Sequence, residues 1–195
     1  MWEQIAKKFP NSQDYLIFEV MNEIHDGGWG FGENKYDNGK QYSVLNEWNQ
    51  ICVDSIRKTG ATNFISVPGY VTNPELTMKH LILPKDSLNK IFVTVHSYNP
   101  SYYAIEAKIP KWGSSVPVEE LTYKNPYGDG NLVLDGEKYF TELFGKLYEK
   151  YIKNGIPVLL SECGATYQKR YENYRRYYVE VMVKTACING IVPIL

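Results

Sequence analysis

Short apolar runs alternate with longer amphipathic segments along this chain. A strand that is buried on both faces is typically a short, nearly continuous apolar run, so each such run predicts a strand. The predicted strands cover residues 15–23, 63–68, 91–96, 157–162 and 191–195. Apolar residues at helical spacing predict helices over residues 45–56, 75–81, 139–152 and 171–189, and residues 1–9 are typical of the end of an amphipathic helix.

This regular alternation of strands and helices predicts an α/β fold with a parallel sheet. Long loops follow the first and third strands, over residues 24–42 and 99–134, whereas the returns from helix to strand are short. Such an arrangement is typical of a (β/α) barrel, in which the loops at the carboxyl ends of the strands carry the function. The glycines after the first strand do not lead directly into a helix, so a dinucleotide-binding fold is not predicted.

The composition narrows the class of protein further. The chain has 195 residues and a formal net charge of −1, which predicts one domain and argues against bulk electrostatic binding to nucleic acid or to an anionic membrane. Aromatic residues make up 14%, and 17 of them are Tyr, which favours flat surfaces able to form hydrogen bonds, such as sugar-binding clefts. Three buried free thiols are expected from Cys52, Cys163 and Cys187, although one disulfide is compatible with the sequence.

Two carboxylates stand at predicted strand ends. Glu23 ends the first strand and Glu162 ends the fourth, and a charge that closes a buried apolar run is costly unless it is paired or hydrogen-bonded. Either residue alone could form a salt bridge or cap a helix, but two of them on different strands favour a functional site. His96 ends the third strand and Tyr98 follows it at the same rim. A lone His is more often a core residue, whereas Tyr98 could hold a carboxylate in position by a hydrogen bond.

Three segments together carry a resemblance to a known family. Residues 18–23 (FEVMNE), 96–98 (HSY) and 157–164 (PVLLSECG) resemble successive signatures of glycoside hydrolase family 5, the cellulase family, in order and in placement at strand ends. The resemblance implies that residues 15–195 correspond to strands four to eight of the barrel and residues 1–10 to the end of its third helix. The expected fold is thus a partial (β/α)8 TIM barrel that lacks the first three strands.

The same resemblance implies that residues 1–195 form a single incomplete catalytic domain. Family members carry further cleft residues on strands two and three and a Trp after strand eight, and this chain has none of those positions. An open barrel exposes sheet edges, so we expect residues 1–195 alone to be poorly stable and weakly active or inactive.

The resemblance also implies roles for individual residues. Glu23 would be the general acid/base, Glu162 the nucleophile, and Asn22 a hydrogen-bonding partner of the sugar 2-hydroxyl. His96 and Tyr98 would line the cleft, with Tyr98 orienting Glu162. Retaining hydrolysis independently requires two carboxyl groups roughly 5–5.5 Å apart.

Aromatic residues on the two long loops are candidate platforms for sugar rings. Trp29 and Trp112 are the principal candidates, and the tyrosines considered with them are Tyr102, Tyr103, Tyr123 and Tyr127. The alternative is that these rings pack the loops onto the barrel.

The function implied is that of a retaining endo-β-1,4-glucanase that hydrolyses a β-glucan polysaccharide or oligosaccharide; xyloglucan, lichenan and mannan are competing substrates. The alternatives are a non-catalytic carbohydrate-binding α/β fragment and, less well supported, a metal-dependent lyase or an aldolase. No acidic or His cluster has metal-ligand spacing and no strand ends in Lys, so neither a metal nor another cofactor is expected. We expect a monomer without nucleic-acid or membrane partners, and the family implies a secreted or cell-surface location.

Overall fold

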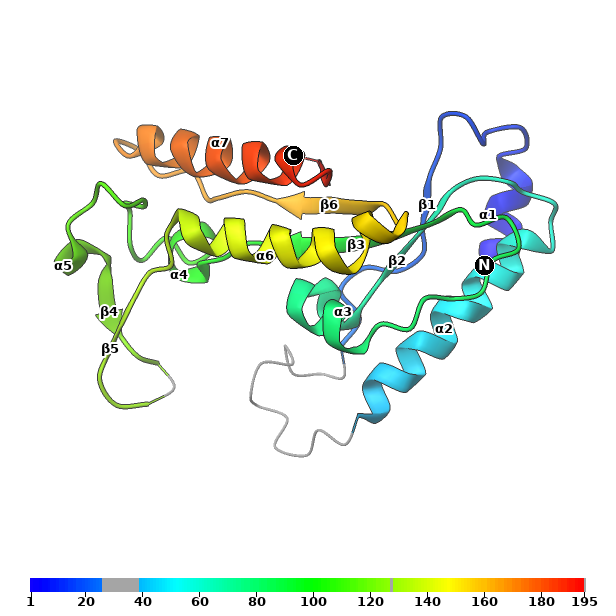
Figure 1. Ribbon diagram of the computed structural model, residues 1–195, viewed down its shortest axis with the longest axis horizontal. Coiled ribbons are helices and arrows are strands. Elements are labelled where there is room, and N and C mark those ends of the chain that lie inside the picture. Colours follow the sequence, from blue (N-terminus) through cyan, green and yellow to red (C-terminus); the bar gives the residue numbers. More distant parts are fainter. Residues whose placement is uncertain (26–38, 127, 195) are drawn as a thin grey trace. The chain divides into compact units, whose positions relative to one another are not determined.

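The computed structural model describes residues 1–25, 39–126 and 128–194 (Figure 1). Its elements, in chain order, are α1 (Trp2–Lys8), β1 (Phe18–Glu19), α2 (Lys40–Arg57), β2 (Ile65–Pro68), η1 (Tyr70–Thr72), α3 (Pro74–His80), β3 (Ile91–Ser97), α4 (Ser101–Ala104), α5 (Val118–Leu121), β4 (Thr122–Lys124), β5 (Asn131–Val133), α6 (Glu137–Lys150), η2 (Ile152–Asn154), β6 (Val158–Cys163), α7 (Glu172–Ile188) and β7 (Val192–Pro193).

The predicted strands form one sheet with the strand order β1-β2-β3-β6-β7. The pairings of β1 with β2 and of β2 with β3 are parallel, which confirms the expected α/β fold with a parallel sheet. The first strand is much shorter than residues 15–23, because the chain turns before it: the amides of Tyr15 and Leu16 both donate to the carbonyl of Ser12. Residues 99–134 are predicted to be a loop, but their described part contains two short helices and the antiparallel hairpin β4–β5.

The chain divides into two compact units, Met1–His96 with Glu149–Leu159 and Ser97–Tyr148 with Leu160–Leu195. In the first unit, α1 and α2 cover one face of β1 and β2. The covered side chains are those that alternate toward the helices, namely Phe18, Val20, Ile65 and Val67, and they pack with Ala6, Val53 and Ile56. Because neighbouring side chains on a strand point to opposite faces, Glu19 and Ser66 lie on the other face of the sheet.

A buried ion pair joins the end of α2 to the segment before β3. Arg57 donates from Nε and Nη2 to the two carboxylate oxygens of Asp86, at 2.8 and 3.0 Å, and the amide of Lys90 donates to the same carboxylate at 2.9 Å. The Asp86 side chain is 1% exposed. The hydrogen bonds from Arg57 lower the pKa of Asp86 from 3.8 to about 2.

Replacing Asp86 by Asn is expected to lower the free energy of unfolding by about 3 kcal/mol at pH 7, because it leaves the Arg57 charge buried without its partner. The folded pKa lies below the ordinary value, so the contribution of Asp86 is present above about pH 4 and is lost as the pH falls toward 2. Urea unfolding at pH 7, 4 and 2.5 measures this difference. It should shrink with acidification, and the exposed variant Glu142→Gln should match the parent throughout.

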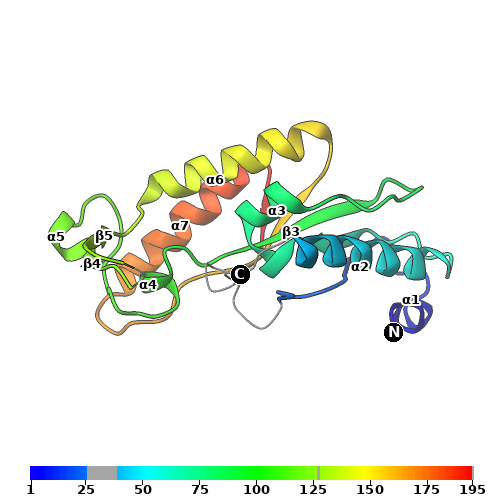
Figure 2. The ribbon, with the colours of Figure 1, turned by 90° about the horizontal axis from the view of Figure 1, so that it is seen from below.

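In the second unit, α6 and α7 lie side by side, as Figures 1 and 2 both show. Their contact is aromatic: the rings of Phe140 and Tyr178 have centroids 5.4 Å apart, and Phe140 stacks on Phe144 at 5.7 Å. All three side chains are fully buried. The amphipathic pattern of residues 139–152 therefore predicted the buried face of α6 correctly.

Cys52, Cys163 and Cys187 are free thiols, as expected, but the expectation that they are buried is wrong: Cys52 and Cys163 are half-buried and Cys187 is exposed. Within the described ranges, no helix combines the length and the apolar character that crossing a membrane requires.

Candidate active site

Glu23 lies in a bend after β1. The apolar pattern predicts that Glu23 ends the strand, and this prediction is wrong. Its backbone is left-handed, with φ of 38°, and its amide donates to the hydroxyl of Thr72 at 3.1 Å. The amide of Val20 still donates to the carbonyl of Ser66, so the strand pairing persists for one residue beyond β1 before the chain bends. This bend sets the direction in which the carboxylate of Glu23 leaves the backbone.

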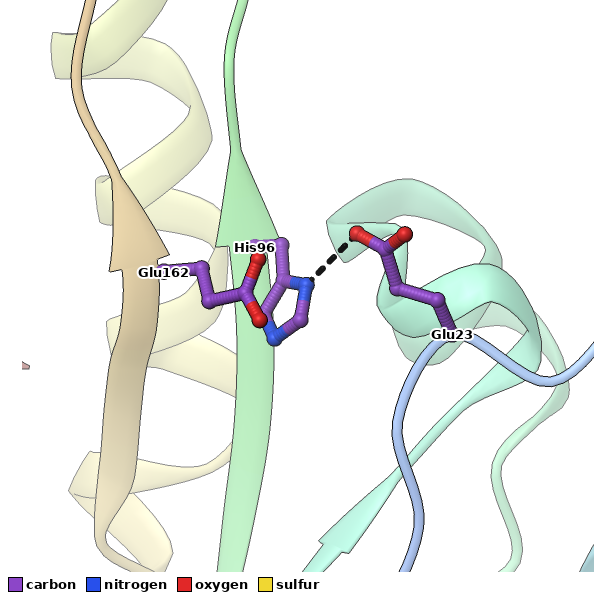
Figure 3. Close-up of side chains that lie close together, drawn as sticks. All are labelled: Glu23, His96 and Glu162. Carbon is purple, nitrogen blue, oxygen red and sulfur yellow. Dashed lines mark hydrogen bonds and ion pairs between the residues drawn. The ribbon is translucent and has the colours of Figure 1, made fainter.

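The carboxylate of Glu23 is hydrogen-bonded to His96, which lies near the end of β3. The distance from Glu23 Oε1 to His96 Nδ1 is 2.8 Å (Figure 3), and the two side chains are 22% and 4% exposed. An ionised carboxylate accepts from an Nδ1–H, and a protonated carboxyl group donates to a bare Nδ1. The pair can therefore hold one shared proton in a largely buried setting.

Glu162 is the second carboxylate at a strand end, near the end of β6 in the second unit, and Figure 3 draws its side chain there. The hydroxyl of Tyr98, which directly follows β3, donates to Glu162 Oε2 at 3.2 Å. A phenol in this position orients the carboxylate and stabilises its negative charge. The expected contact between Tyr98 and Glu162 is thus present.

The segment that carries Tyr98 is held by α6 and α7. The hydroxyl of Tyr178 on α7 donates to the backbone carbonyl of Asn99 at 2.9 Å. The side-chain Nδ2 of Asn99 in turn donates to the hydroxyl of Tyr139 on α6. Burial raises the pKa of Tyr178 far above its usual range, so its hydroxyl keeps the proton that it donates. The aromatic core of this unit therefore fixes the backbone next to Tyr98.

Comparison with known proteins agrees with these features. Residues 1–192 match the family model described as Cellulase (glycosyl hydrolase family 5). The chain belongs to this cellulase family. Endoglucanase A from Paenibacillus barcinonensis is 31% identical over 100% of the chain and 50% of its own length.

Two solved structures of family 5 enzymes superpose closely on the chain. A broad-specificity endoglucanase from Bacteroides salanitronis has a TM-score of 0.85 and 40% identity, covering 99% of this chain and 50% of that one. A xyloglucanase from Paenibacillus pabuli has a TM-score of 0.82 and 31% identity, covering 99% and 55%. The chain thus spans about half the length of these relatives.

Trp112 does not form a sugar platform in this cellulase family member, which corrects the expectation from its place on a long loop. It is 1% exposed and its indole Nε1 donates to the carbonyl of Asp135 at 2.8 Å. The ring packs edge-on against Tyr178, with centroids 5.0 Å apart, and contacts Phe140 at 6.0 Å. Its role is to anchor the loop on the core of α6 and α7.

Replacing Trp112 by Leu is therefore expected to lower the free energy of unfolding by about 3 kcal/mol, because it leaves a cavity and an unpaired Asp135 carbonyl. The KM for a soluble β-glucan should stay within a factor of two in the folded fraction. Thermal unfolding measures the change in stability, and initial rates measure the KM, both on the protein as its gene encodes it. A raised KM with unchanged stability would restore the platform interpretation.

The other predicted site residues are placed less decisively. Asn22 is exposed beside Glu23, and its contact with a sugar hydroxyl stays a prediction. Tyr103 is buried, whereas Tyr102 and Tyr123 are half-buried and stack on each other with centroids 4.2 Å apart. Trp29 and Tyr127 lie outside the described residues. The platforms for sugar rings therefore remain a prediction apart from Trp112.

Sequence reasoning missed two threonines that contact the acidic residues. Thr72 binds the amide of Glu23, and Thr94 donates its hydroxyl to Glu19 at 3.0 Å. Thr94 stands two residues before His96 on the same strand, so strand alternation could have placed it on the same face. Thr72 lies in η1, far from Glu23 in sequence, and no pattern signals it.

Proposed function

We propose that this protein is a retaining endo-β-1,4-glucanase in which Glu162 is the nucleophile and Glu23 the general acid/base. The observation that carries the proposal is the different chemistry of their partners. Glu162 accepts a hydrogen bond from a phenol, which suits an ionised nucleophile, whereas Glu23 shares a hydrogen bond with an imidazole, which suits a group that gains and loses a proton.

The reaction proceeds in two displacements. A carboxylate oxygen of Glu162 attacks the anomeric carbon while Glu23 gives its proton to the departing glycosidic oxygen, which leaves as an alcohol. The resulting glycosyl ester on Glu162 is then attacked by water. Glu23 takes a proton from this water, the ester bond breaks, and both carboxyl groups return to their starting states. Neither step requires a metal or another cofactor.

This mechanism makes a geometric demand on the complete enzyme. Retention requires carboxyl groups of Glu23 and Glu162 about 5–5.5 Å apart, whereas about 6.5–9.5 Å would leave room for water and give inversion. We propose that the sheet β1-β2-β3-β6-β7 corresponds to strands four to eight of an eight-stranded barrel, with residues 1–195 as part of one catalytic domain. The coverage of about half of each solved relative supports this correspondence.

The proposed substrate is a β-1,4-linked glucan. The names of the relatives include an endoglucanase, a broad-specificity endoglucanase and a xyloglucanase, so xyloglucan is the strongest competitor. Because the loops of a barrel set substrate preference, the family alone does not choose between them. Such polymers do not enter cells, which supports a secreted or cell-surface location, and we propose that the enzyme acts as a monomer.

The stereochemistry of the first product tests this function. We expect proton NMR of cellotetraose hydrolysis by the protein as its gene encodes it to show the β-anomer before mutarotation sets in. Early appearance of the α-anomer would contradict the retaining mechanism. Binding of cellotetraose without any hydrolysis would instead favour a non-catalytic carbohydrate-binding protein.

A further inference from the structure

The face of the first unit's sheet that turns away from α1 and α2 carries a row of polar side chains. On β3, Thr94 and His96 alternate onto this face, and both are buried, at 0% and 5% exposure. Ser66 on β2 is also fully buried, and it is paired in register with the half-buried Glu19 on β1. A carboxylate in such a place must be stabilised by hydrogen bonds or charges.

Glu19 meets this requirement by reaching across the intervening strand. Its Oε2 accepts a hydrogen bond of 3.0 Å from the hydroxyl of Thr94, although β2 lies between β1 and β3 in the sheet. Thr94 and His96 are two residues apart, which is about 6.6 Å along a strand. The bond therefore ties β1 to β3 one pleat below the point where His96 meets Glu23.

The contact between Glu23 and His96 depends on the spacing of these same two strands. Glu23 follows β1 after a left-handed bend. Because β1 is only two residues long, few backbone hydrogen bonds to β2 fix its position along the strand direction relative to β3. A side-chain link between the strands supplies this missing restraint. A shift of about 1 Å at a reacting group can cost on the order of 100-fold in rate.

We propose that Glu19 is a positioning residue that holds the acid/base Glu23 through its hydrogen bond to Thr94. The inference rests on the proposed function of Glu23. Loss of Glu19 should impair the proton transfers that Glu23 carries out in both steps, and leave the attack by Glu162 intact.

The test compares two substrates with the protein as its gene encodes it. Cellotetraose has a poor leaving group that must be protonated, whereas 2,4-dinitrophenyl β-cellobioside has a leaving group that departs without a proton. We expect Glu19→Ala to lower kcat/KM for cellotetraose by about 10- to 100-fold and for the dinitrophenyl substrate by less than about threefold. Glu19→Gln should recover most of the loss, because its amide oxygen still accepts from Thr94.

Thr94→Val removes only the hydroxyl, so it should reproduce the leaving-group-dependent loss even if Glu19→Ala fails to fold. The exposed variant Glu47→Ala on α2 is the control and should match the parent on both substrates. Equal losses on both substrates, or no loss in Thr94→Val, would overturn the positioning role. If Glu23→Ala itself shows no dependence on the leaving group, the proposed function of Glu23 fails; if only Glu19→Ala lacks it, the inference alone fails.

Discussion

Replacing Glu162 by Ala is expected to lower kcat on cellotetraose by at least about 10⁴-fold, because the variant lacks the carboxylate that forms the covalent intermediate. A loss of this size corresponds to about 5.5 kcal/mol of transition-state stabilisation. The fold should survive, because Glu162 is half-buried and Tyr98, which donates a hydrogen bond to it, keeps its place through the neighbouring Asn99.

Azide offers a sharper readout of the same variant. With the nucleophile shortened, azide can enter on the side that Glu162 occupied and displace the leaving group of 2,4-dinitrophenyl β-cellobioside directly. One displacement inverts the anomeric centre, so the expected product is the α-glycosyl azide. Glu142→Ala on α6, which is exposed, should retain full hydrolysis without azide. Substantial hydrolysis by Glu162→Ala, or a β-azide product, would show that Glu162 is not the nucleophile.

Much of the fold could be predicted because burial and periodicity act locally. The strands around Val67, Val93 and Leu160 are nearly continuous apolar runs, and the side chains of these three residues are fully buried. The helical spacing of Phe140, Phe144 and their neighbours likewise predicted a buried stripe on α6. In these segments the apolar pattern of one strand or helix is enough to predict its buried face, because the element packed against that face only has to be apolar.

The errors came where hydrogen bonds or distant packing contacts override the apolar pattern. Residues 15–17 are apolar enough for a strand, yet the turn around Ser12 takes their backbone out of the ladder. Trp112 lies on a loop rich in Pro, Gly and Tyr that predicts exposure, but the aromatic surface of α6 and α7 draws the ring inside. The turn is local, but its hydrogen bonds to Ser12 leave no mark in the apolar pattern. The partners of Trp112, by contrast, are distant in sequence.

The candidate site shows the same division. Strand ends predicted that His96 and Tyr98 would accompany the acidic residues, since side chains at the carboxyl ends of parallel strands gather at one rim. The partners assigned within each unit, His96 with Glu23 and Tyr98 with Glu162, depend on side-chain direction and on the bend at Glu23. That bend needs the hydroxyl of Thr72, a contact that no single-segment pattern contains.

Replacing Glu23 by Ala is expected to lower kcat/KM for cellotetraose by about 10³-fold, within the range of about 10²–10⁴ typical of general acid catalysis. Hydrolysis of 2,4-dinitrophenyl β-cellobioside should keep a nearly normal first step, because its leaving group needs no proton. The second step should become slow, because no base activates water, so the glycosyl ester on Glu162 should accumulate. A rapid burst of dinitrophenol followed by a slow steady state would report this accumulation.

Azide then separates the role of Glu23 from that of Glu162. Azide needs no general base, so it should react with the accumulated ester of Glu23→Ala and raise the steady-state rate. It enters from the face opposite to Glu162, and two successive inversions give the β-glycosyl azide. Glu47→Ala on α2 is the matched control in the first unit and should show neither a burst nor azide activation. An α-azide from Glu23→Ala would exchange the two proposed roles, because only a variant that lacks its nucleophile allows a single displacement.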